Sequence, residues 1–210
     1  RFSLELPIQN VVGNLAALSH FLGQAASAWP GAQGQATHEA FDPMQSAVKA
    51  PLAAPPASPS HTVGSASLIV SFLEAIGVDH VFGVPGGANE PLYNAMAQSM
   101  RRGGLRPVVA RHEAGAAFMA DGYARETGKI GVCVATSGPG ATNLITGVAC
   151  AYDNGVPMLV ITGQPSLPVF GKGALQESSC TGINTVGMFS HCTRYNTLVS
   201  HVDQLETKLV

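Results

Sequence analysis

The sequence predicts an α/β domain, a doubly wound parallel sheet with helices on both faces, preceded by a flexible N-terminal segment. Hydrophobic residues make up 46% of the 210 residues and charged residues only 11%, a composition that suits a well-buried core. Beyond residue 61, short apolar runs alternate with segments of helical periodicity, and the joints between them are short. This alternation is typical of parallel strands connected by helices.

Four helices are predicted from apolar residues that recur at helical spacing or from a run of small residues. The first three cover residues 65–76, 91–100 and 114–127. The fourth begins at the tight turn formed by residues 137–140 and reaches to about residue 153. Gly77 and Gly128 stand just past the ends of two of these helices, where a glycine favours a left-handed end. The helix boundaries are therefore marked in the sequence as well as the helices themselves.

Four strands are predicted between these helices. They cover residues 81–84, 107–110, 130–136 and 156–162. The run IGVCVAT is continuously apolar, which predicts a strand that is covered on both faces, and VPMLVIT is predicted to be another buried strand. In an open parallel sheet, ligands bind beyond the carboxyl ends of the strands, so we expect the functional residues in the segments that follow these runs.

Residues 1–60 differ in composition from the rest of the chain. They hold seven of the 14 prolines but only five charged residues, and residues 30–60 lack the apolar surface to fold alone. We expect 1–60 to be a flexible Ala/Pro-rich extension and 61–210 to be the folded domain. A short amphipathic helix over 11–22 is one feature that the extension allows. A targeting peptide is an alternative for the whole of 1–60, although arginine is almost absent from it.

Charge and cysteine spacing exclude several classes of protein. A net charge of -2 and a pI of about 6.4 argue against a nucleic-acid-binding protein. No apolar run reaches the roughly 18 residues that a membrane-spanning helix needs. The four cysteines show no C-x-x-C spacing, so neither a metal site nor a disulfide framework is indicated. Reduced thiols predict the cytoplasm, with a plastid or mitochondrion as the alternative if residues 1–60 are a transit segment.

Glu113 is the most informative candidate for chemistry. It follows a predicted buried strand directly and precedes a helix of small apolar residues. A carboxylate there is poorly solvated, which favours its protonated form and lets it carry or share a proton near neutrality. The structural alternative is that an acid at a helix N-terminus is stabilised by the helix dipole, typically by about 0.3–1 kcal/mol. The residues alone leave both interpretations open.

Two glycine turns also fall at the expected rim of the sheet, Gly86-Gly87 and 138–140. Glycines let the backbone approach a ligand closely, but such turns are also ordinary connections between a strand and a helix. Neither turn has the G-x-G-x-x-G pattern or the P-loop pattern, so the sequence does not indicate a phosphate site.

Four ordered blocks of the chain resemble the N-terminal, pyrimidine-binding domain of thiamine-diphosphate enzymes. They are residues 81–88 (VFGVPGGA), 111–125 (RHEAGAAFMADGYAR), 131–143 (GVCVATSGPGATN) and 156–164 (VPMLVITGQ). Within that superfamily, residues 65–210 are most similar to the acetohydroxyacid (acetolactate) synthase large subunit. The resemblance implies the thiamine-diphosphate-binding fold.

The resemblance implies roles for four residues. Glu113 matches the glutamate that hydrogen-bonds the aminopyrimidine ring of the cofactor and shares a proton with it. Gln176 matches a glutamine that reaches the reacting centre, where its amide donates to the keto-acid oxygen. Gly86 and Gly87 match a glycine pair beside the cofactor, where the missing side chains leave room for substrate.

The activity that the resemblance implies is an acetolactate synthase-type carboligase. Such an enzyme decarboxylates pyruvate and adds the hydroxyethyl carbanion to a second 2-keto acid, in branched-chain amino acid biosynthesis. Thiamine diphosphate is the expected cofactor. Mg²⁺ and FAD are expected through central and C-terminal domains that this chain lacks, so we expect the chain alone to be inactive. A homodimer or homotetramer and a regulatory small subunit are the implied partners.

Two departures from the family pattern concern the substrate. Gly173-Ala174-Leu175 replaces the common Asp-Ala-Phe, and Val84 replaces a common Tyr, so we expect a substrate channel of different shape. The alternatives to a carboligase are another thiamine-diphosphate decarboxylase, oxidase or acyltransferase, and a truncated dimerising domain without catalysis.

Overall fold

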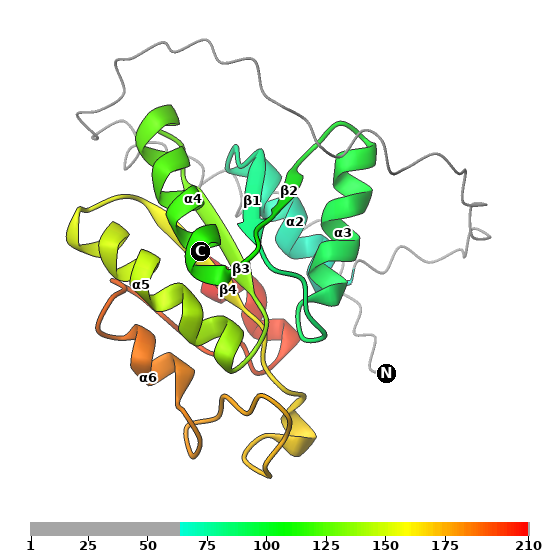
Figure 1. Ribbon diagram of the computed structural model, residues 1–210. Coiled ribbons are helices and arrows are strands. Elements are labelled where there is room, and N and C mark those ends of the chain that lie inside the picture. The colour runs from blue at the N-terminus through cyan, green and yellow to red at the C-terminus, as the bar shows by residue number, and fades with distance from the viewer. Residues whose placement is uncertain (1–63, 210) are drawn as a thin grey trace, which may run out of the picture.

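The centre of the molecule is a four-stranded, all-parallel sheet, as the sequence predicts (Figure 1). A computed structural model describes residues 64–209. The strands are β1 (His80–Gly83), β2 (Arg106–Val109), β3 (Gly131–Ala135) and β4 (Met158–Thr162), in the spatial order β2-β1-β3-β4. Gly83 at the end of β1 pairs with Val109 on one side and Val134 on the other. The carboxyl ends of the strands therefore lie along one rim.

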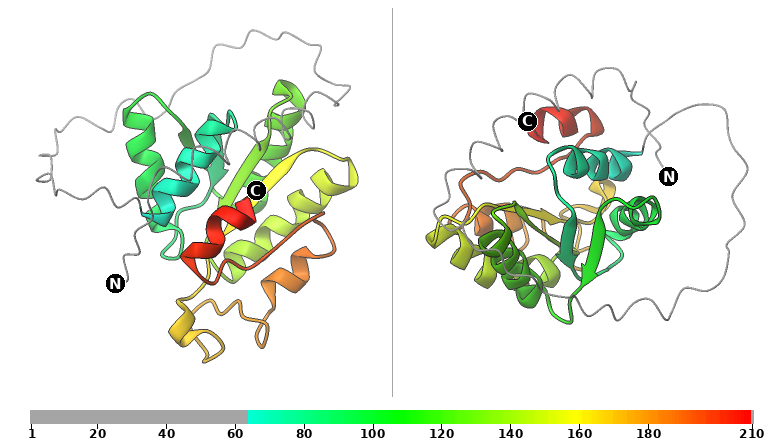
Figure 2. Two further views of the ribbon diagram at one scale, coloured as in Figure 1. Left: turned by 180° about the vertical axis from the view of Figure 1, so that it is seen from behind. Right: turned by 90° about the horizontal axis from the view of Figure 1, so that it is seen from above.

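Helices cover both faces of this sheet (Figure 2). The long helices are α2 (Ser65–Ala75), α3 (Glu90–Arg101), α4 (Glu113–Thr127) and α5 (Pro139–Asp153). Four short elements follow: η1 (Leu167–Val169), α6 (Thr185–Phe189), η2 (Val202–Gln204) and α7 (Leu205–Leu209). Alternate residues of β3 point to opposite faces: Val132 and Val134 join the core under α2 and α3, whereas Cys133 and Ala135 join the core under α4 and α5. The predicted doubly wound arrangement is confirmed.

Helix α4 packs closely against β3 and α5 through small residues. A Cβ at Gly131 would collide with the backbone of Ala120, and one at Gly147 would lie 2.5 Å from the Cβ of Ala117. Ala116, Ala117 and Ala120 are fully buried at this contact. We call these five residues the small-residue seam. Because no side chain separates the backbones here, the position of α4 on the sheet is closely defined.

The predicted helix ends are confirmed. Gly77 and Gly128 have φ angles of 81° and 69°, and the N–H of Gly128 bonds to the Ala124 carbonyl 3.0 Å away. Only glycine adopts this left-handed conformation without a steric cost. The bounds of α2, α3 and α4 differ from the predicted ones by at most one residue at each end. Helix α4 begins at Glu113 itself, so Glu113 is the first residue of the helix.

The prediction that residues 156–162 form a buried strand is wrong in the degree of burial. Alternate residues of the strand do pack against the cores on the two faces of the sheet, but none of them is fully buried. The strand is shorter, Met158–Thr162, and all of its residues are half-exposed. The reason is its place at the edge of the sheet, since β4 has a neighbour only in β3 among the described residues. The similar run in β3 is central, and all of its residues are buried.

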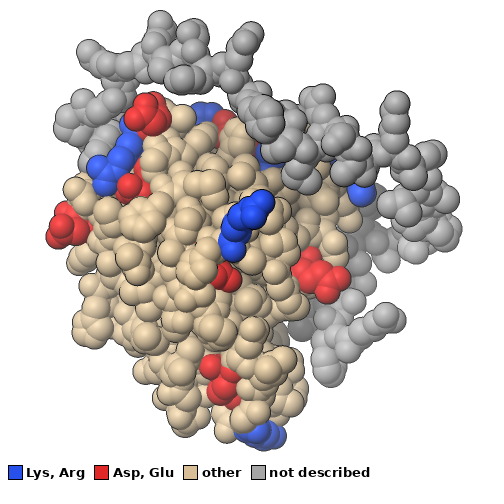
Figure 3. Space-filling view, in the orientation of Figure 1, with Lys and Arg blue, Asp and Glu red and all other residues tan. Residues whose placement is uncertain are grey.

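The predicted extension over 1–60 and its helix over 11–22 lie outside the described residues, and the division of the chain at residue 61 stays a prediction. Within residues 64–209, no helix has the length and apolar character needed to cross a membrane. On the face that carries α4 and α5, few charged side chains are visible (Figure 3).

Candidate functional site

The chain reverses its direction of winding between β1 and β3. These strands are neighbours, but β1 leads to β2 on one side of the sheet, and β3 leads to β4 on the other. Ligands of open α/β sheets bind at such a switch point, beyond the strand ends. The two segments that leave the sheet there are residues 84–89 after β1 and 136–138 after β3.

The turn after β1 is held by a buried asparagine. Asn89 is 4% exposed, its Oδ1 accepts from the Gly86 N–H at 2.7 Å, and its Nδ2 donates to the Val84 carbonyl at 3.0 Å. Both halves of the amide are thus used to fold the backbone into the turn. The conformation of the Gly86-Gly87 segment is set before any ligand arrives.

Gly86 and Gly87 have different surroundings. A Cβ at Gly86 would lie 2.7 Å from the Cβ of Thr136, whereas a Cβ at Gly87 would meet nothing within 4 Å. Thr136 is buried, and its Cγ2 lies 2.7 Å from the corresponding position on Gly140. Gly86 is therefore required by packing against Thr136. Gly87 is the one of the pair that leaves space open at the rim.

Glu113 lies beside this packed group, at the first position of α4. Its carboxylate is half-buried: Oε2 accepts a hydrogen bond from Nδ2 of Asn143 at 3.0 Å, and Oε1 lies 3.4 Å from the Cβ position of Gly140. The helix itself is capped by His112, whose Nδ1 accepts from the N–H of Ala114 at 3.2 Å. A carboxylate fixed through one oxygen keeps the other available to accept or share a proton.

Asn143 is a site residue that the sequence reasoning missed. It lies in the first part of α5, within the block GPGATN, and its contact with Glu113 joins the N-terminal ends of α4 and α5. The sequence did indicate that the helices now labelled α4 and α5 both start at the same rim of the sheet. Without the strand order, the pairing of these two residues was not predictable.

Gln176 belongs to the loop between β4 and α6, beyond the carboxyl end of β4 (Figure 1). It is exposed and has a φ of 57°, a left-handed conformation that costs a non-glycine residue about 1–2 kcal/mol. Its Cβ lies 2.9 Å from the Cβ position of Gly138, at the start of α5. The structure thus brings Gln176 to the same turn that carries Gly140, next to the group around Glu113.

The following residue, Glu177, is bound to the backbone of its own loop. Its carboxylate accepts hydrogen bonds from the N–H groups of Gly171, Ala174, Ser178 and Ser179, at 3.0, 3.4, 3.2 and 3.0 Å. Desolvation acts to raise the pKa of Glu177, but these bonds outweigh it and lower the pKa below its ordinary value. The carboxylate is therefore charged at neutral pH.

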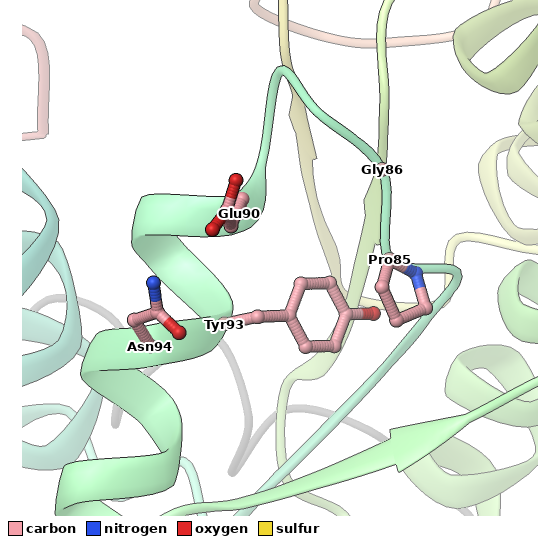
Figure 4. A pocket seen from close by; sticks show the side chains of 5 residues that line it. All are labelled: Pro85, Gly86, Glu90, Tyr93 and Asn94. Carbon is pink, nitrogen blue, oxygen red and sulfur yellow. The ribbon is translucent and has the colours of Figure 1, made fainter.

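The turn after β1 and the first part of α3 line an open cavity of about 390 Å³ (Figure 4). It is lined by Pro85, Gly86, Glu90, Tyr93 and Asn94. The ring of Tyr93 points from α3 toward Pro85, and burial raises the pKa of its hydroxyl to about 12. Only Gly86 connects this cavity with the predicted site residues, since neither Glu113 nor Gln176 lines it.

No metal centre accompanies these groups in residues 64–209. Nowhere in that range do three His, Cys, Asp or Glu side chains gather closely enough to hold a metal ion. The chemistry that the site offers is that of a fixed, half-buried carboxylate and a nearby exposed amide.

Residues 64–183 match the family described as thiamine pyrophosphate enzyme, N-terminal TPP binding domain. This match covers more than half of the chain and includes the two glycines, Glu113, Asn143 and Gln176. The chain belongs to the thiamine pyrophosphate enzyme family. The resemblance described from the sequence is confirmed, and the parallel α/β architecture is consistent with such a domain.

Several acetolactate synthases are similar to this chain in amino-acid sequence, not only in fold. The acetolactate synthase of Arthrospira platensis is 50% identical over 121 residues, which are 58% of this chain and 21% of that protein. The acetolactate synthase isozyme 2 large subunit of Escherichia coli (strain K12) is 47% identical over 143 residues, 68% of this chain and 24% of that subunit. The acetolactate synthase large subunit of Lactococcus lactis is 47% identical over 135 residues, 64% of this chain and 22% of that subunit. The chain therefore spans less than a quarter of the length of these relatives.

Proposed function

We propose that this chain is the pyrimidine-binding part of an acetolactate synthase-type carboligase, which decarboxylates pyruvate and joins the remaining two carbons to a second 2-keto acid. The observation that carries the proposal is the carboxylate of Glu113, half-buried at the switch point of the sheet and held at 3.0 Å by Asn143. The identity to acetolactate synthases over the same residues supports the choice of reaction.

The residues at the rim fit the pyrimidine end of thiamine diphosphate. A ring nitrogen can share a proton with Glu113, and the space beside Gly87 admits a ring close to the backbone. When bound, the cofactor supplies the carbanion chemistry that protein side chains lack. Glu113 holds the shared proton, Asn143 fixes the direction of its carboxylate, and Gln176 donates its amide hydrogen to the keto-acid oxygen as charge develops there.

The proposal also includes features that depend on the parts of the relatives that this chain does not match. Mg²⁺ with the diphosphate and FAD would be held by central and C-terminal domains. The assembly would be a homodimer or homotetramer, with a regulatory small subunit as a further partner. The role of the chain would lie in branched-chain amino acid biosynthesis in the cytoplasm. Alone, the chain is expected to form no acetolactate.

A chimera tests the reaction. The matching segment of the Escherichia coli isozyme 2 large subunit, 47% identical, is replaced by this chain's residues. Acetolactate is measured with pyruvate alone, and the six-carbon product, acetohydroxybutyrate, is measured with 2-ketobutyrate added. We expect activity in the chimera and a loss of about 100-fold or more in Glu113→Gln, since acid–base residues contribute at least that factor. Glu126→Gln, an exposed glutamate in the last part of α4, is the matched control and should leave activity unchanged.

The proposal fails if the folded chimera forms no acetolactate, or if Glu113→Gln is as active as the parent. Formation of a different product from pyruvate would favour the alternative of another thiamine-diphosphate decarboxylase, oxidase or acyltransferase. Unfolding temperatures of the variants, measured in parallel, distinguish loss of catalysis from loss of fold.

A further inference from the structure

The loop that carries Gln176 has little regular structure of its own. Residues 171–179 contain turns but no helix or strand, and their backbone bonds include the N–H of Glu177 to the Ala174 carbonyl at 3.1 Å. Such a segment is expected to be mobile unless side chains hold it. Gln176 adopts a left-handed conformation within this segment and therefore needs a further source of order besides its contact with the turn at Gly138.

Glu177 supplies that order. Its Oε2 accepts from Gly171 at 3.0 Å and Ala174 at 3.4 Å, on the N-terminal side of the loop. Its Oε1 accepts from Ser178 at 3.2 Å and Ser179 at 3.0 Å, on the C-terminal side. One carboxylate thus joins the two sides of the loop, and Gln176 lies between them.

Only an ionised carboxylate of this length can make all of these bonds. Glutamine offers a single acceptor oxygen, and its amino group would face two N–H donors. Aspartate has the two oxygens but is shorter by one methylene. The Glu177 side chain is therefore suited to ordering the loop, and both of its oxygens already accept hydrogen bonds from backbone N–H groups.

We propose that Glu177 is a positioning residue: it fixes the backbone and Cβ of Gln176 against the turn at Gly138, which orients the Gln176 side chain, and so sets turnover without contacting the substrate. The catalytic part of this inference rests on the proposed function of Gln176. The geometric part, that Glu177 holds the loop, rests on the hydrogen bonds alone.

The geometric part is tested by NMR relaxation on the whole chain. Backbone order parameters of Ala174, Gln176 and Ser178 are expected near the rigid value of about 0.85 in the wild type and below about 0.6 in Glu177→Gln. Lys172→Gln is the control, because Lys172 is an exposed residue of the same loop and should leave these values unchanged. Wild-type order parameters in Glu177→Gln would overturn the inference.

The catalytic part is tested by a double-mutant cycle in the chimera. Glu177→Gln is expected to lower kcat about tenfold or more, with the KM for thiamine diphosphate unchanged, since misplacing a catalytic group by about 1 Å costs as much as 100-fold. In the Gln176→Ala background the same substitution should have no further effect, and Glu177→Asp should recover part of the loss. Effects that multiply independently would overturn the inference, because a merely structural residue does not act through Gln176.

The two arms separate this inference from the proposed function. An inactive parent chimera removes the proposed function and the catalytic part together, while the order parameters still decide whether Glu177 holds the loop. An active chimera with a rigid loop in Glu177→Gln overturns the inference and leaves the proposed function in place.

Discussion

The contrast between the two neighbouring glycines of the first rim turn gives the sharpest prediction from the structure. Gly86→Ala introduces a Cβ 2.7 Å from the Cβ and 2.8 Å from the Oγ1 of Thr136, closer than carbon atoms approach in real contacts. Thr136 has little freedom to move away, because it is buried and its Cγ2 already occupies the space left by the missing side chain of Gly140. Overpacking of this kind costs about 1–3 kcal/mol.

The matched change, Gly87→Ala, meets no atom within 4 Å, and Gly87 is not among the glycines with positive φ. We expect it to alter the free energy of unfolding by no more than about 0.5 kcal/mol. At about 2–4 °C per kcal/mol for a domain of this size, Gly86→Ala should lower the Tm by about 2–12 °C, and Gly87→Ala by about 2 °C at most.

Thermal unfolding followed by circular dichroism on the whole chain measures both values. Gly87→Ala then serves a second purpose, because a folded variant with a methyl group at the open rim should bind thiamine diphosphate less tightly than the wild type. Equal Tm values for the two variants, or a larger loss in Gly87→Ala, would refute the assignment of Gly86 to packing and Gly87 to open space.

Three further predictions follow from the hydrogen bonds and burial. Asn143→Ala should lower the free energy of unfolding by about 1 kcal/mol. Asn143→Asp should lower it by more, because a second carboxylate would then face Glu113. A wild-type Tm in Asn143→Asp at about pH 8 would contradict the contact between the two residues. Folding lowers the pKa of Glu177, so the stability that this carboxylate contributes is present above its ordinary pKa of 4.5 and is lost as the pH falls below that value. Urea unfolding midpoints measured between about pH 6 and pH 3 should therefore fall less steeply in Glu177→Gln than in the wild type. Identical slopes in the two proteins would argue against the hydrogen bonds of Glu177. Burial raises the pKa of the Cys133 thiol to about 12, so iodoacetamide at about pH 8 should label the exposed Cys180 at least about 100-fold faster than Cys133. Mass spectrometry measures both labelling rates, and equal rates in the folded chain would exclude the burial of Cys133.

The sequence predicted the elements better than their environments. Every long helix and every strand was recognised, because apolar periodicity and the glycines at helix ends are local signals. The half-exposure of β4 was missed, because a strand's place at the edge of a sheet depends on the order in which the strands assemble. Burial of an apolar run is a property of its neighbours, which local periodicity does not contain.

The candidate site shows the same division. The rim position of Glu113 was predictable from a strand followed at once by a helix. Its contact with Asn143 was not, since it depends on two helix starts meeting at a switch point. The difference between Gly86 and Gly87 depends on Thr136, which a neighbouring strand supplies. The organising bonds of Glu177 arise from a loop conformation with no sequence signature.

The small-residue seam couples the position of α4 to the geometry of the candidate site. Ala116 and Ala117 lie about one helical turn from Glu113, and Gly147 of α5 packs closely against Ala117. A bulkier residue at Gly147 would tilt the whole helix and carry the carboxylate away from the rim, although Gly147 itself has no chemistry to offer. In an enzyme with the proposed function, substrate preference and turnover should therefore respond to substitutions along this buried contact, which lies away from the candidate site itself.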